Sequence, residues 1–131
     1  MASAPYPTGM KKLLDADIDM LVDDIVALLY NGTFSAAHQF ISDLSGTIND
    51  RSGPLSGKTT TAGVFDANNE TVTTVPASTT LAVVIAKSTG VDATSPLICY
   101  LELASPFVLA SIADVSIVWN VSGIFQLAAC P

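Results

Sequence analysis

Two apolar runs near the centre of the chain give the clearest pattern of hydrophobic and polar positions. Leu81–Lys87 reads LAVVIAK and Leu97–Leu103 reads LICYLEL, and a polar connection rich in Gly, Thr, Ser and Asp joins them. Short apolar runs bounded by such residues are typical of β-strands. The pattern predicts two adjacent strands at the structural centre of the fold.

A third run, Ile25–Tyr30, reads IVALLY and is apolar at both odd and even positions. A strand of this kind is buried on both faces or lies against a partner. The dipeptide Asn31-Gly32, a common turn signal, is expected to end it.

The remaining segments predict several short strands and one short helix. The helix is expected over Ser35–Leu44, with Ser35 as N-cap and apolar residues along one side. The further strand candidates are Lys58–Thr61, Val64–Asp66, Glu70–Val75, a short piece Phe107–Ala110 after the interruption at Pro106, and a closing hairpin of Val115–Asn120 and Ile124–Ala128 joined by Val121–Gly123. The fold class is therefore expected to be mainly β: a single-domain antiparallel β-sandwich, jelly-roll-like or barrel-like, with one short helix.

The first nine residues are expected to lie outside this sandwich domain, which comprises residues 10–131. Pro5 and Pro7 flank Tyr6, and prolines disfavour regular helix and favour extended backbone. Two interpretations follow. The segment is either a frayed terminus or an arm laid across a neighbouring subunit, with Tyr6 as its anchor.

The densest charge in the chain follows directly, beginning with Asp15, Asp17 and Asp19. This spacing resembles the start of a calcium-binding loop. The sixth position is Met20 where Gly is needed, and the twelfth is Val26 where a bidentate Glu is needed. The acidic residues therefore predict a solvated turn ahead of the apolar strand.

Composition favours association between chains. Half of the 131 residues are hydrophobic and 13% are charged, against about 25% in a typical soluble domain. A domain of this size cannot bury so much apolar surface within itself, so part of it is expected to meet another subunit. The alternative is a weakly polar surface of Ala, Thr and Ser.

Charge and run length exclude two partner classes. The net charge is −7, and the five basic residues are scattered, which argues against nucleic-acid binding. The apolar runs are about six residues long, whereas a membrane-spanning helix needs about 20. The N-terminus has no pattern typical of a signal peptide. We therefore expect a soluble protein made in a cytoplasm, with no membrane partner.

The two cysteines are far apart and have no metal or redox spacing. Cys99 is expected in the core, while strand parity places Cys130 on the opposite face from the inward residues of the closing hairpin. This disfavours an internal disulfide and predicts two free thiols by default. If Cys130 forms a disulfide, a partner chain is the reasonable candidate.

Site chemistry is sparse along the chain. The single histidine, His38, has no nucleophile or carboxylate beside it in a recognisable motif. Neither a nucleophile elbow, a phosphate loop nor a zinc-peptidase helix occurs. We therefore expect no enzymatic activity, no cofactor and no metal.

One resemblance bears on function. The segment Ser88–Glu102, STGVDATSPLICYLE, resembles a pattern common in small structural virion proteins of tailed bacteriophages, of the capsid decoration or cement type. The segments Leu55–Ala67 and Asp114–Leu127 are similar to other parts of that family in the same order, and the match runs from Lys11 to Leu127. The chain departs from the family at Ile112-Ala113, where glycines are common, and in its shorter last turn.

The resemblance implies a structural virion component without enzymatic activity. We expect a capsid decoration or cement protein, synthesised in the bacterial host cytoplasm, that binds the outside of the major capsid lattice and stabilises it. Its expected partners are the major capsid protein and copies of itself, in a homo-oligomer. The alternatives are a head–tail connector or tail component, or a receptor-binding fibre or spike domain. The expected interaction residues are Pro5, Tyr6, Pro7, Asp15, Asp17, Asp19 and Cys130.

Overall fold

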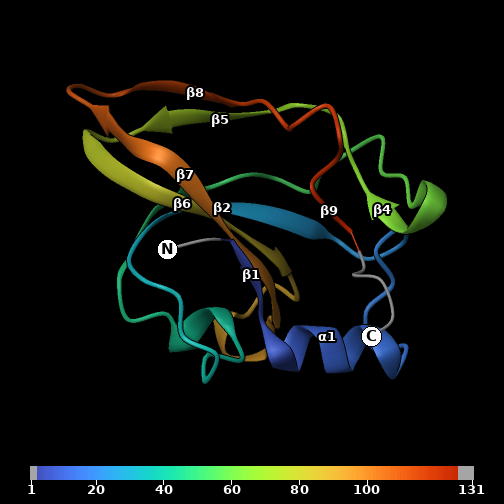
Figure 1. Cartoon of the computed structure of the whole chain (residues 1–131). Coiled ribbons are helices and arrows are strands. Elements are labelled where there is room, and N and C mark those ends of the chain that lie inside the picture. The colour runs from blue at the N-terminus through green and yellow to red at the C-terminus, as the bar shows by residue number, and fades with distance from the viewer. Residues whose placement is uncertain (1–2, 127–131) are drawn as a thin grey trace.

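The computed structural model describes residues 3–126, which form a mainly β, antiparallel, sandwich-like fold with one α-helix, as the sequence predicts (Figure 1). The strands are β1 (Ala4–Pro5), β2 (Ile25–Asn31), β3 (Thr47–Arg51), β4 (Val64–Phe65), β5 (Glu70–Val75), β6 (Ser78–Lys87), β7 (Leu97–Leu109), β8 (Ala113–Ile117) and β9 (Phe125–Gln126). The helical segments are α1 (Pro7–Leu14) and three short 3-10 turns, η1 (Ile41–Asp43), η2 (Thr61–Gly63) and η3 (Asp92–Thr94).

A five-stranded sheet in the order β1-β7-β6-β2-β3 is the main layer. Its centre is the antiparallel pair β6 and β7, in which Val84 lies opposite Tyr100 and Ile85 opposite Cys99. These strands contain the two apolar runs Leu81–Lys87 and Leu97–Leu103, so the predicted pair is confirmed.

Strand β2 is buried on both faces, also as predicted. Ile25, Ala27 and Leu29 pack into one hydrophobic cluster, whereas the alternate residues Val26 and Leu28 pack into a second. The first cluster lies between the main sheet and the two small sheets β5-β8 and β4-β9. The second is covered by Tyr6 and by apolar residues of the connection between β2 and β3.

The prediction that Val115–Asn120 and Ile124–Ala128 form a closing hairpin is wrong. Strand β8 pairs with β5, and β9 pairs with β4. The chain after β8 is held on the β4–β5 connection instead, because the Trp119 indole Nε1 donates to the Asn68 carbonyl oxygen at 3.0 Å. Val115 and Ile117 are nevertheless buried, as their parity predicts. The end of the predicted strand Ile124–Ala128 lies outside the described residues.

The predicted helix Ser35–Leu44 is also wrong. Its middle is tied to the β6–β7 connection, because Ile41 N–H donates to the Ser95 carbonyl oxygen at 2.9 Å, and its internal backbone hydrogen bonds make only isolated turns, of which η1 is the helical one. The α-helix is α1, which begins at Pro7. Proline is tolerated at the first helical position, where its missing N–H would have no intrahelical partner.

Pro106 does not interrupt β7. The register with β6 shifts so that Thr80 faces Phe107 and Ala82 faces Glu102, which leaves Pro106 in a bulge where no ladder N–H is required. Two further segments differ from expectation: strand β3 had no predicted counterpart, and Lys58–Thr61 contributes one bridge between Thr59 and Asp66 instead of a strand.

Candidate interaction surface

Tyr6 lies in the chain's own core. Its side chain has 0% exposure, its ring centroid is 5.0 Å from that of Phe34, and its backbone N–H donates to the Ile98 carbonyl oxygen at 2.9 Å. Burial raises the pKa of the Tyr6 phenol, and the hydroxyl has no hydrogen-bond partner within residues 3–126. Tyr6 therefore anchors the N-terminal segment to its own sheet.

The prolines on either side of Tyr6 are exposed. Pro5 belongs to β1 and lies opposite Cys99, while Pro7 starts α1. The prediction of an extended arm over residues 1–9 is wrong from Pro7 onward, because the helix begins there. A contact of Pro5 or Pro7 with a neighbouring subunit stays a prediction.

The predicted acidic turn lies at the other end of α1. Asp15, Asp17 and Asp19 are exposed, whereas Ile18 and Met20 between and after them are buried and anchor the turn to the first cluster. The Asp19 Oδ1 atom accepts hydrogen bonds from the backbone N–H groups of Leu21 and Val22, at 3.0 and 3.2 Å. The turn is solvated, as its sequence predicts.

Two lysines hold this turn against the sheet. Lys87 of β6 forms an ion pair with Asp23 at 3.1 Å, and its Nζ also donates to the Asp17 carbonyl oxygen at 3.0 Å. Lys58 donates to the Asp23 carbonyl oxygen. The pKa of Asp23 is lowered, first by the hydrogen bond from the Asp19 backbone N–H and then by Lys87. In residues 3–126, no three His, Cys, Asp or Glu side chains are grouped so as to hold a metal ion.

An apolar hollow of about 420 Å³ opens beside α1, between the helix and the η2 region. We call it the helix hollow. Leu14 stands at its edge with 86% exposure, and the acidic turn follows directly in the chain. Its lining residues are Met10, Leu13, Leu14, Met20, Thr60, Gly63, Phe65 and Phe125. The arrangement presents a concave apolar surface next to carboxylates.

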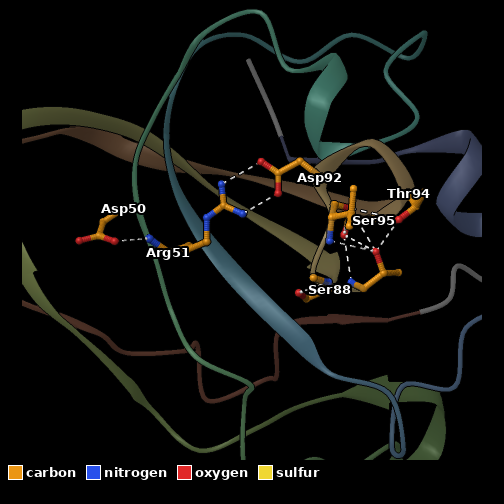
Figure 2. Close-up of polar contacts among 9 residues, drawn as sticks. Asp50, Arg51, Ser88, Asp92, Thr94 and Ser95 are labelled. Atoms are coloured by element: carbon orange, nitrogen blue, oxygen red, sulfur yellow. Dashed lines mark hydrogen bonds and ion pairs between the residues drawn. The ribbon is translucent and has the colours of Figure 1, made fainter.

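The connection from Ser88 to Pro96, which carries the resemblance, is closed by its own hydroxyl groups. Thr94 and Ser95 lie close together (Figure 2), and the Thr89 Oγ1 atom lies 2.6 Å from Thr94 Oγ1 and 3.1 Å from Ser95 Oγ. Arg51 of β3 donates to both carboxylate oxygens of Asp92 at 2.8 and 3.2 Å (Figure 2). This ion pair lowers the pKa of Asp92. The loop's polar groups thus serve its own structure.

The predicted interaction residues do not converge on one point. Tyr6 lies before the start of α1 and Asp15 caps its end, so the eight-residue helix separates them. Cys130 lies outside the described residues. Sequence reasoning missed the helix hollow; the helical spacing of the apolar residues Met10, Leu13 and Leu14 indicates one of its walls, but not the distant residues that complete it.

No family model, curated protein or solved structure matches this chain. None of the helices within residues 3–126 has the length and apolar character needed to cross a membrane.

Proposed function

We propose that this chain is a structural protein of a tailed-bacteriophage particle that binds the outside of the major capsid lattice and stabilises it. The observation that carries the proposal is the helix hollow: a concave apolar surface that is bordered by exposed Leu14 and followed by the acidic turn. The resemblance through Ser88–Glu102 supplies the class of particle.

The helix hollow suits a protein partner rather than a reaction. An apolar side chain of the shell protein would fill it, and basic groups on the same partner would lie opposite Asp17 and Asp19, since Asp15 already forms an ion pair with Lys11. Apolar contact supplies most of the affinity in such an interface, while charge complementarity sets orientation and association rate. A ligand that binds only the assembled shell stabilises that state by mass action. The net charge of −7 also suits an outer position, away from packaged DNA.

Imaging of the intact particle tests this function. We expect hundreds of copies on the outer shell, and particles that lack the chain should burst at lower temperature. Six or twelve copies at the neck or tail, or copies at a fibre tip, would overturn the decoration role in favour of the alternatives. Unchanged heat resistance of particles without the chain would overturn the stabilising role.

A single substitution tests the helix hollow. Leu14→Asp places a charge at an apolar contact without disturbing the core, because Leu14 is 86% exposed. We expect at least about tenfold weaker binding to shells that lack the chain, since burying one Leu contributes roughly 1.5–3 kcal/mol. The control is Val91→Asp, an exposed apolar position outside the hollow. Equal binding by both variants would exclude the hollow as the contact.

A further inference from the structure

Charge is nearly absent from the last part of the chain. From residue 103 to residue 131 the single charged side chain is that of Asp114, although the whole chain carries −7. The Asp114 carboxylate accepts a hydrogen bond from the Thr74 backbone N–H at 3.0 Å, within the β5-β8 sheet. This region is therefore where two copies of an acidic protein approach with least repulsion.

The same region contains a long, mainly apolar depression, which we call the seam; Glu102 is the one charged residue among those that line it. It consists of two adjoining hollows of about 290 and 340 Å³ between β7 and β8. Both hollows are lined by Val83, Leu103, Ile117 and Val118. Figure 1 shows β8 and α1 at opposite ends of the molecule, so the seam is distinct from the helix hollow.

A fully exposed apolar side chain stands beside the seam. Val121 lies in a turn fixed by two hydrogen bonds: Gly123 N–H donates to the Asn120 carbonyl oxygen at 2.9 Å, and Ser122 N–H donates to Asn120 Oδ1 at 2.8 Å. Gly123 adopts a φ of +103°, which favours glycine. Asn120 and Gly123 themselves line the second hollow. The turn thus presents an apolar projection at the edge of an apolar depression.

We propose that two copies of this chain pair about a two-fold axis, with Val121 of each copy inserted into the seam of the other. A projection next to a complementary depression is the arrangement that a two-fold contact requires, because each copy offers both halves. Side chains make this contact rather than a shared β-ladder, since β1 pairs with β7 only at Cys99 and Tyr100, and Pro106 on the part of β7 beyond that pairing has no N–H to donate.

The pairing is expected to be weak in solution. A stable interface buries about 800 Å² on each partner, and one inserted side chain with its surroundings covers less. Copies held side by side on a lattice would pair more effectively, because their effective concentration is high. This biological role rests on the proposed function, whereas the pairing is a property of the isolated chain.

Sedimentation velocity of the full chain tests the pairing. With Cys130→Ser to remove thiol cross-linking, we expect concentration-dependent dimers between about 1 and 500 µM, the range of weak interfaces. Val121→Asp should weaken the dimer at least about tenfold, because it places a carboxylate in the apolar seam. Val91→Asp, at an apolar position in the β6–β7 connection that is 58% exposed, should leave it unchanged.

A photo-crosslinker at position 121 identifies the contact directly. In mixtures of light and heavy isotope-labelled chains, we expect mixed-isotope cross-links to peptides containing Leu103 or Val118. A monomer throughout the concentration range, dimers that Val121→Asp leaves intact, or cross-links elsewhere would overturn the pairing. Two variants distinguish the two proposals. If Val121→Asp no longer pairs but still binds the shell, the pairing and the decoration role are separate. If Leu14→Asp no longer binds the shell but still pairs, the pairing stands without the proposed contact at the helix hollow.

Discussion

The ring of Tyr6 packs on the ring of Phe34, with centroids 5.0 Å apart and planes inclined at 43°. Phe34 in turn lies 5.9 Å from the Tyr100 ring. Three aromatic residues from the N-terminal segment, the β2–β3 connection and β7 thus close the second hydrophobic cluster. The N-terminal segment is therefore a structural part of the fold.

This packing predicts opposite results for two substitutions of Tyr6. Tyr6→Phe keeps the ring and removes a buried hydroxyl that has no partner among the described residues, so it should leave stability unchanged or raise it by about 1 kcal/mol. Tyr6→Ala leaves a cavity and should lower the free energy of unfolding by about 3–5 kcal/mol. Urea denaturation measures both. A large loss in Tyr6→Phe would mean that the hydroxyl has a partner.

Ala16 offers a stabilising substitution. It follows the end of α1 with a φ of 62°, in the left-handed region that disfavours residues with a Cβ. Ala16→Gly should raise the free energy of unfolding by about 0.5–1 kcal/mol, the relief of strain being partly offset by greater freedom of the unfolded chain. The control Ala36→Gly, at an exposed turn position without positive φ, should be neutral or destabilising. A loss in both variants would contradict strain at Ala16.

Elements with a strong apolar pattern could be predicted from the sequence. β2 and the β6–β7 pair lie where their apolar runs indicate, because burial on one or both faces constrains the choice of residues in each strand, and β5 lies at its predicted threonine-rich run. The mainly β class follows from them. The acidic turn is exposed, as its charged residues predict, and Cys99 is buried, as its position in the alternating pattern of β7 predicts.

Partner choice between elements could not be predicted. The Val115–Asn120 pattern indicates a strand, but it does not show with which strand this one pairs. The next strand in the sequence is the predicted partner, whereas the observed partner is β5, which lies more than 30 residues earlier. Helical spacing misled at Ser35–Leu44 because packing on the β6–β7 connection outweighs local propensity. The helix hollow and the seam arise from pairs of distant segments, so a pass along the chain does not reveal them.

The hydrogen bond from the Asp19 backbone N–H to Asp23, together with the ion pair between Asp23 and Lys87, predicts a pH-dependent contribution to stability. The folded state lowers the pKa of Asp23 below its ordinary value of about 3.9, so the contribution is complete above that value and is lost as the pH falls through the folded pKa. Asp23→Asn should cost about 0.5–1 kcal/mol at pH 7, because solvent screens a partly exposed pair, and almost nothing near pH 2. Asp24→Asn is the matched exposed control. Thermal unfolding from pH 2 to 7 measures the difference, and an equal cost at both extremes would contradict the linkage.

Cys99 predicts the opposite dependence at alkaline pH. Burial raises the pKa of its thiol to about 12, above the ordinary value of about 8.5. Between these values the unfolded chain releases a proton that the folded chain retains, so stability should fall by up to about 1.4 kcal/mol per pH unit. Cys99→Ala removes this contribution, and its unfolding free energy should fall less steeply from pH 9 to 11. Parallel curves for the two proteins would contradict the raised pKa.

Thiol labelling gives an independent measure of the same burial. In a Cys130→Ser background, a chromogenic disulfide reagent reports on Cys99 alone. Because the thiolate is the reactive form and the native thiol is both neutral and 3% exposed, labelling requires the main sheet to open. Its rate at low urea should therefore track the population of unfolded chains, and Tyr6→Ala should accelerate it in proportion to the stability it removes. Labelling that is fast in native buffer and unaffected by Tyr6→Ala would show instead that β7 opens locally at Cys99.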